Sequence, residues 1–321
     1  MVLTTKASRL ISPKTEQVRK RNATLVKMRK NYDLYLFLLP TLIYLLIFRY
    51  HPMYGVQIAF KDFIASDGIW GSEWVGFDHF LRFFRSYMFS TVLRNTITLS
   101  LYGMVFGFLP PILLALMLNH VGSGRFKKFV QSVTYAPHFI SVVVMVSILF
   151  CFLSPRSGVV NTAIQLFGGE PINFMGEQRW FRFIYIVSGI WQELGFASVI
   201  YIAALAGVGP ELHEAAIMDG ANKLQRIRHI DIPGILPTAV IMLILKAGGI
   251  MSVGFQKTFL MQTPLNLSTS QVISTYVYNV GLINGDFSFA TAVGLFNSVV
   301  NLIMILLVNA IARKVNETSL W

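Results

Sequence analysis

The sequence predicts an all-α membrane protein with six transmembrane helices, and its composition and apolar pattern carry this prediction. Apolar residues make up 54% of the 321 residues and charged residues only 13%, which is about half the charged share of a typical globular protein. The apolar residues also occur in long blocks, without a repeat of two or 3.6 residues. A soluble fold of this length would need a charged surface, so the composition indicates a surface that faces lipid.

Six apolar blocks reach the roughly 20 residues that a helix needs to cross the hydrocarbon core of a bilayer. Helices are expected because a segment inside lipid must satisfy its backbone hydrogen bonds within itself. The expected spans are residues 34–53, 93–118, 129–153, 183–208, 235–255 and 287–312. The last five of these spans form a transmembrane core over residues 93–312.

Basic residues place both chain ends in the cytoplasm. Nine Lys or Arg residues fall between Lys6 and Lys30, in the tail of residues 1–33 that precedes the first span. With this tail inside, the inner segments, which include residues 313–321, hold 17 of the 27 Lys and Arg. Inner loops of membrane proteins carry such an excess. The net charge of +12 therefore indicates a multi-pass protein whose tail meets anionic membrane lipid, and not a nucleic-acid binder.

Residues 54–92 form an extracytoplasmic loop in this arrangement. Trp70 and Trp74 are typical of the aromatic belt at a membrane surface. The segment Phe80–Phe89, FLRFFRSYMF, has apolar residues at helical spacing and predicts a helix along the outer interface. Anchoring to lipid and contact with a partner protein both account for such a helix.

The inner loop of residues 209–234 predicts two short helices around a turn. Pro210 suits the first position of a helix, and Gly220 suits the left-handed residue that ends it after Asp219. The second helix is expected to end before Pro233, because the residue that precedes a proline disfavours the helical region. From these residues alone, a simple connection between two spans and a surface for a partner protein are equally compatible.

The same loop resembles the EAA motif of the permease subunits of ATP-binding-cassette (ABC) importers. It reads Glu214-Ala215-Ala216, three residues, Gly220, nine residues, and Ile230-Asp231-Ile232-Pro233, with Ile232 where the motif usually has Leu. The surrounding run, EAAIMDGANKLQRIRHIDIPGILP, resembles the sugar-transporting branch of type I importers. The motif lies in the compartment to which the basic residues assign this loop.

This resemblance implies a type I ABC-importer permease fold in a bacterial inner membrane, and a coupling role for the loop. In such permeases the helix of the motif seats in a groove of an ATPase subunit. The residues of this contact would be Glu214 as the anchor, Gly220 at the turn, and Ala215, Ala216, Asp219 and Pro233 around them. The chain has no Walker A pattern, so ATP would be bound by partner subunits and no cofactor is expected on this chain.

The resemblance also implies partners and a cargo. The expected partners are a second permease subunit, which in the resembling subgroup is a different chain, two ATPase subunits and an extracytoplasmic solute-binding protein. Two segments, Pro52–Phe63 and Lys246–Leu260, are similar to a subgroup that imports complex oligosaccharides, including pectin-derived ones such as rhamnogalacturonan fragments. The expected function is that of a permease subunit which passes an oligosaccharide across the membrane and is not itself an enzyme.

Two charged residues lie inside expected spans, Glu193 in the fourth and Lys246 in the fifth. Charges at such a depth are costly, and they face a protein interior or an aqueous cavity. Their distances from the inner ends of their spans, roughly 22 Å and 16 Å at about 1.5 Å per residue, are close enough for mutual neutralisation. A structural ion pair and a pair of substrate contacts, to sugar hydroxyls or to a uronic carboxylate, are equally open.

The neighbours of these two charges offer groups that suit a sugar. Sugar rings present apolar faces that stack on aromatic side chains, and rims of hydroxyls that bind amides and carboxylates. The candidate substrate path consists of Trp191, Gln192, Glu193, Lys246, Ser252 and Gln256.

Two other classes of protein compete with this interpretation. An ion-coupled secondary transporter should carry ion-site carboxylates inside several spans, and only Glu193 lies in such a place. An intramembrane enzyme should show a metal-ligand or nucleophile pattern, and the six histidines are scattered without the spacing of metal ligands. Catalytic and metal-binding residues are therefore not expected, and the secondary transporter stays the alternative.

Overall fold

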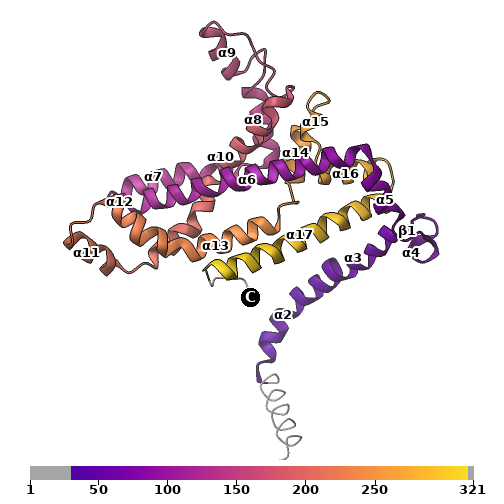
Figure 1. Ribbon diagram of the computed structural model, residues 1–321, viewed down its shortest axis with the longest axis horizontal. Helices are drawn as coiled ribbons and strands as arrows, with labels where there is room; N and C mark the ends of the chain where they lie inside the picture. Colours follow the sequence, from indigo (N-terminus) through magenta and orange to yellow (C-terminus); the bar gives the residue numbers. More distant parts are fainter. Residues whose placement is uncertain (1–29, 317–321) are drawn as a thin grey trace, which may run out of the picture. The chain divides into compact units, whose positions relative to one another are not determined.

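The computed structural model describes residues 30–316, and almost all of its secondary structure is helical (Figure 1). Five of the described helices are long and apolar enough to cross a membrane, and a pair of helices bent by 99° brings the number to six if it counts as one span. These helices confirm the predicted all-α fold. The cytoplasmic position of the two chain ends stays a prediction, and the tail before Lys30 lies outside the described residues.

The residues up to Gln57 form a unit of their own. Its helical run consists of α2 (Tyr32–Leu45), the π-helical turn η1 (Leu46–Tyr50) and α3 (His51–Met53), and it continues into the 3-10 segment η2 (Tyr54–Phe60). No side chain of α2 is buried within this unit. The apolar sequence of this helix suits a lipid environment, as that of the first predicted span would.

The second unit begins with a short irregular segment that leads to α6. This segment holds the strands β1 (Lys61–Asp62) and β2 (Glu73–Trp74), which pair antiparallel, and the helices α4 (Gly68–Gly71) and α5 (Asp78–Arg85). The helix expected over Phe80–Phe89 is divided, because the extended backbone of Ser86 ends α5 and its hydroxyl caps α6. Phe83 of α5 is completely buried between the rings of Phe89 and Phe289, so α5 is anchored in the core of the unit.

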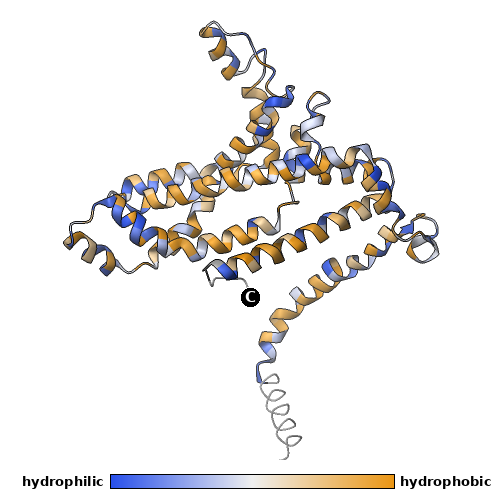
Figure 2. Cartoon of the chain, in the orientation of Figure 1, coloured by the Kyte–Doolittle hydropathy of each residue, from blue (hydrophilic) through white to orange (hydrophobic). Residues whose placement is uncertain are grey.

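Long helices make the core of this second unit. α6 (Tyr87–Asn119) packs along α10 (Gln178–Ala206), and α13 (Ile232–Gly248) packs against α10 and α17 (Phe287–Asn316). Figure 1 shows α13 and α17 running side by side. Where α6, α10 and α13 meet, an apolar cluster is formed by Ala115, Leu116, Tyr201, Leu205, Ile235 and Ala239. Figure 2 shows mainly hydrophobic residues along these helices and hydrophilic residues gathered around α12, the distribution expected for helices in lipid.

The third expected span, residues 129–153, is not one continuous helix. It is divided into α7 (Gly124–Tyr135), the 3-10 turn η3 (Ala136–Phe139) and α8 (Val142–Phe152), and the two arms meet at 99°. Pro137 lacks the N–H that a continuous helix needs. The hydroxyl of Ser141 accepts a hydrogen bond from Val144 N–H at 3.3 Å and starts α8 in its new direction. The buried amide of Gln192 donates to the Ile140 carbonyl at the break, at 2.9 Å.

The helix that was expected to end before Pro233 continues through it, so this expectation is wrong. α12 (Lys223–Arg226), the π-helical turn η4 (Ile227–Asp231) and α13 follow each other without a break, and Ile232 is helical with φ −61°. A π-turn inserts one extra residue, which makes room for the proline ring within a helix. The turn η1 stands in the same relation to Pro52. Pro233 itself is exposed at the start of α13.

The fifth span ends earlier than expected, because α13 stops at Gly248 and not at residue 255. Two successive glycines, Gly248 and Gly249, disfavour a helix. The coil that follows is fixed by Asn301 of α17, which accepts from Met251 N–H at 2.9 Å and donates to the Ser252 hydroxyl at 3.0 Å. Shorter helices complete the unit: α9 (Val159–Leu166), α14 (Phe255–Met261), α15 (Leu267–Ser270), α16 (Ile273–Tyr278) and the π-turn η5 (Asn279–Ile283).

Candidate functional site

The loop of residues 209–234 forms the two helices and the turn that the sequence predicts. Its first helix, α11 (Pro210–Met218), is followed by Gly220 with a φ of +77°. The N–H groups of Gly220 and Ala221 donate to the carbonyls of Ile217 and Ala216 at 3.0 and 2.8 Å. This pair of bonds is the usual closure of a helix on a left-handed residue. Local hydrogen bonds therefore end α11 at this turn.

Most side chains of α11 are exposed, and only His213 and Ala216 are half-buried. None of them is buried. Glu214, Ala215 and the following Asp219 are exposed, and Ala216 is half-buried. Met218, an apolar residue, is 87% exposed. Figure 1 shows α11 beside α12 at one end of the long helices, where a partner protein can reach it.

A completely buried carboxylate lies where this loop enters α13. Asp231, the last residue of η4, is 0% exposed. Its oxygens accept hydrogen bonds from His120 Nε2 at 2.5 Å and from Asn119 Nδ2 at 3.3 Å, both at the end of α6. His213 Nε2 of α11 lies 3.3 Å from the Asp231 Oδ1 atom. These four residues, which we call the Asp231 cluster, join three elements.

A cleft of about 390 Å³ lies between α6, α10, α13 and α14. Its lining brings together two of the predicted residues, Glu193 and Lys246, although they are far apart in the sequence. Lys257 of α14 lies in the same lining. The cleft therefore carries two ammonium groups and one carboxylate.

Each of these charged groups is bonded separately. Glu193 Oε2 lies 3.1 Å from Nδ1 of His138, whose ring stacks on Phe196. Lys246 Nζ donates to the Gly107 carbonyl at 3.2 Å. Lys257 Nζ donates to the Tyr185 carbonyl at 2.7 Å.

The other predicted residues of the path take different positions. Gln192 also lines the cleft, but it is 7% exposed and its amide nitrogen is bonded at the α7–α8 break. Ser252 lines a neighbouring cavity of about 220 Å³ that shares Lys246. Trp191 is 48% exposed and Gln256 is exposed, and neither lines these two cavities. The structure thus places Gln192, Glu193, Lys246 and Ser252 in the lining of these two adjoining cavities. Trp191 and Gln256 lie outside both linings.

Lys257 and His138 escaped the sequence analysis for different reasons. Lys257 follows the position at which the fifth span was expected to end, so it was counted in an outer loop. The glycine pair before it was the available signal for an earlier helix end. His138 approaches Glu193 from 55 residues away along the chain, and no local pattern indicates such a contact.

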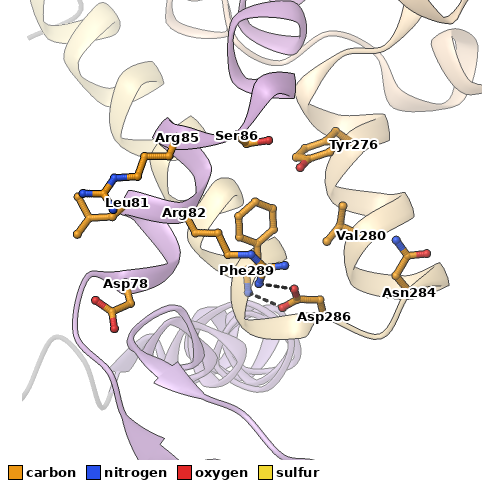
Figure 3. A pocket seen from close by; sticks show the side chains of 10 residues that line it. All are labelled: Asp78, Leu81, Arg82, Arg85, Ser86, Tyr276, Val280, Asn284, Asp286 and Phe289. Atoms are coloured by element: carbon orange, nitrogen blue, oxygen red, sulfur yellow. Dashed lines mark hydrogen bonds and ion pairs between the residues drawn. The ribbon is translucent and has the colours of Figure 1, made fainter.

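A larger pocket of about 830 Å³ lies between α5, the α16–η5 helix and the start of α17. Figure 3 shows Arg82 reaching across it to Asp286, with an Nη1–Oδ2 distance of 2.8 Å. The guanidinium also lies over the Phe289 ring, 4.5 Å from its centroid. Arg85 extends from the α5 side of this pocket in the same view. This pocket was not expected from the sequence.

Known proteins match this chain along most of its length. Residues 111–317 match the family model described as "Binding-protein-dependent transport system inner membrane component". The chain is 44% identical over 302 residues to the "Polygalacturonan/rhamnogalacturonan transport system permease protein YteP" of Bacillus subtilis (strain 168), with 94% of each chain covered. It is also 44% identical over 294 residues to "Protein LplB" of the same organism, with 92% of each chain covered.

A solved structure matches equally well. The crystal structure of a bacterial alginate ABC transporter in complex with alginate pentasaccharide-bound periplasmic protein contains a chain that is 42% identical to this one. The TM-score is 0.85, and the match covers 92% of this chain and 98% of that chain. These matches confirm the resemblance that the EAA motif indicates. The chain therefore belongs to the binding-protein-dependent transport system inner membrane components, the multi-pass permease subunits of ABC importers.

Proposed function

We propose that this permease subunit imports oligosaccharides that carry uronic carboxylates, and that separate ATPase subunits drive it through the loop of residues 209–234. The observation that carries this proposal is the uncovered helix α11. This helix has no buried side chain and its Met218 is 87% exposed, so most of its surface is accessible to another protein. Its acidic Glu214 and its small neighbours Ala215 and Ala216 suit close packing against another protein.

The roles of the loop residues follow from their positions. Glu214 is exposed on α11 and serves as the polar anchor for the ATPase subunit. The short side chains of Ala215, Ala216 and Asp219 let the partner surface approach the helix backbone. Gly220 holds the turn with its φ of +77°, which L-residues with a side chain rarely adopt. Pro233 lies at the start of α13, the spanning helix that would move when the ATPase subunit displaces α11.

The partners of the chain belong to this proposal. The second permease subunit is a different chain, two ATPase subunits bind ATP, and an extracytoplasmic solute-binding protein delivers the oligosaccharide. The absence of a Walker A pattern from the sequence supports ATP binding on the partner subunits and no ATP site on this chain. The apolar sequence of α2 supports contact with lipid and with the second permease.

The cargo proposal is supported by the charges in the cleft. Lys246 and Lys257 give it one more positive than negative group when Glu193 is ionised. An ammonium group binds a carboxylate through charge-assisted hydrogen bonds, which are stronger than neutral ones. The names of the relatives point to the same chemistry, because YteP is named for polygalacturonan and the structural relative transports "the acidic polysaccharide alginate".

A charge reversal on α11 tests the coupling role. The complete complex is reconstituted, and the stimulation of ATP hydrolysis by sugar-loaded binding protein is measured. Glu214→Lys is expected to leave the chain in the membrane and to reduce this stimulation about tenfold or more, because it replaces an attractive contact by a repulsive one. Glu211→Lys, which makes the same charge change on the same helix outside the motif, is the matched control. Unchanged stimulation in Glu214→Lys would refute the coupling role.

A further inference from the structure

The Asp231 cluster lies between the coupling loop and two spanning helices. Asp231 closes η4 and leads directly into α13, His120 and Asn119 end α6, and His213 belongs to α11. The imidazole rings of His120 and His213 meet edge to face, with an interplanar angle of 73° and centroids 6.1 Å apart. Their side chains are only 14% and 21% exposed, so the cluster is largely shielded from solvent.

A buried carboxylate constrains its surroundings. Removing an ionised carboxylate from water is costly unless hydrogen bonds and positive partners replace the lost solvation. An ionised carboxylate only accepts hydrogen bonds, so Asn119 and His120 must both present N–H groups to Asp231. Any displacement of α6 or η4 that separates these groups exposes the carboxylate to the full desolvation penalty. The two elements are therefore expected to move together.

α11 has few other connections to the spans. None of its side chains is buried. His213 Nε2 lies 3.3 Å from Asp231 Oδ1, and this polar side-chain contact joins α11 to η4. A force that a partner protein applies to α11 can therefore reach α6 and α13 through this contact as well as through the chain itself.

We propose that Asp231 is a positioning residue for coupling, which transmits the movement of α11 to α6 and α13 through His213 and His120. This inference rests on the proposed role of the loop of residues 209–234. A buried carboxylate with its polar partners contributes little net stability compared with apolar residues of similar volume. The cluster instead holds α6, α11 and η4 in a fixed arrangement, and this accounts for a buried carboxylate at this position.

The test uses the complete complex, with its second permease, ATPase and binding-protein partners, in proteoliposomes. The quantity measured is the number of oligosaccharide molecules imported per ATP hydrolysed. His213→Ala is expected to lower this ratio about tenfold, because it removes a contact to a charged group. ATPase subunits should still co-purify with this variant, since His213 faces Asp231. His213→Gln, whose amide N–H can donate to the Asp231 carboxylate, is expected to restore most of the ratio.

The matched control is His229→Ala in the same loop. His229 is exposed, and its Nδ1 is bonded to the carbonyl of Gln225 in its own helix, 2.9 Å away. Its loss removes an imidazole from η4 without touching Asp231, so the ratio should be retained. A loss as large as that of His213→Ala would show that any imidazole of the loop matters, and would overturn the proposal.

A double variant separates transmission from two independent effects. If His213 acts through Asp231, the pair His213→Ala with Asp231→Asn should lose no more than the worse single variant. Losses that multiply would overturn the proposal, as would an unchanged ratio in His213→Ala. If Asp231→Asn fails to fold, His213→Ala and its Gln rescue still decide, because Asp231 keeps His120 and Asn119. If Glu214→Lys leaves stimulated ATP hydrolysis unchanged, the proposed function is wrong. If Glu214→Lys lowers it but the His213 variants keep the wild-type import ratio, only this inference is wrong.

Discussion

Glu193 and Lys246 line the same cleft, yet no ion pair joins them within 4.0 Å in the part of the chain that the structure describes. Glu193 is bonded to His138, and Lys246 to the carbonyl of Gly107. Of the two alternatives that the sequence left open, a direct structural pair is therefore not formed in this state. Each group keeps bonding capacity for a ligand, since an ammonium has three donors and a carboxylate accepts several bonds.

The exchange of these two charges should not restore transport. Glu193→Lys combined with Lys246→Glu would place a carboxylate beside the Gly107 carbonyl oxygen and an ammonium beside His138, so both local contacts become less favourable. We expect uptake by the double variant to stay as low as in the worse single variant. Uptake of labelled oligosaccharide into proteoliposomes measures this. Recovery to near the wild-type rate would show that the two charges act as a structural pair.

Lys257 should select for acidic cargo. Lys257→Gln keeps a donor near the Tyr185 carbonyl but removes the positive charge from the cleft. We expect about a tenfold lower uptake of a uronic oligosaccharide, because hydrogen bonds to charged groups contribute about 1.5–3 kcal/mol. Uptake of the same oligosaccharide after reduction of its carboxyl groups should change much less.

The control for this prediction is Lys128→Gln. Lys128 is an exposed lysine of α7 that does not line the cleft. It tests whether the loss of one positive charge from the chain matters by itself. An equal fall in the uptake of acidic and reduced oligosaccharides in Lys257→Gln would contradict a role in selecting carboxylates.

The turn of the coupling loop should depend on the backbone of Gly220. A Cβ at this position meets no atom within 4 Å, so space is not the limit. The backbone conformation limits substitution instead: the φ of Gly220 is +77°, and a left-handed conformation costs an alanine about 1–2 kcal/mol. Gly220→Ala is expected to reduce the binding-protein-stimulated ATP hydrolysis, while Gly294→Ala in α17, also in open space and without a positive φ, should not. Equal activity of the two variants would show that the turn geometry is not needed.

Close packing between α10 and α7 depends on Gly195. A Cβ built there would lie 2.1 Å from the carbonyl oxygen of Thr134, a backbone atom that cannot move aside. Gly195→Ala is therefore expected to destabilise the protein by about 1–3 kcal/mol, the usual range for overpacking. Gly103→Ala, whose Cβ would be 3.7 Å from Ile186, is the control. The two midpoints of thermal unfolding, measured in detergent, should differ clearly, and equal midpoints would contradict this account of the packing.

The elements that were predicted from the sequence depend on local chemistry. Long apolar blocks predict spans, and the turn at Gly220 follows from its backbone freedom. Pro137 is a local cause of the break in the third span. Hydropathy alone nevertheless predicts a single helix there, because the residues on both sides of the proline are apolar. The course of the chain through Pro233 could not be predicted, because the π-turn η4 removes the clash that normally ends a helix there.

The site was predictable only in part, and for a related reason. Glu193 and Lys246 were found because a charge inside an apolar block is conspicuous. The Asp231 cluster was missed, since Asp231 and His120 are separated by 111 positions and meet only when α6 and α13 pack together. Gln192 was found for its polarity, yet its amide nitrogen is bonded to the Ile140 carbonyl at the break between α7 and α8.

The central claim is that ATP hydrolysis by partner subunits drives the import of an acidic oligosaccharide through this chain. Proteoliposomes that hold the complete complex, with sugar-loaded binding protein outside, test it most directly when the energy source inside is varied. We predict uptake that requires ATP inside, that persists when Na⁺ and H⁺ gradients are dissipated, and that is lost in Glu214→Lys. Uptake that proceeds without ATP and follows an imposed ion gradient would contradict the account and would indicate an ion-coupled secondary transporter.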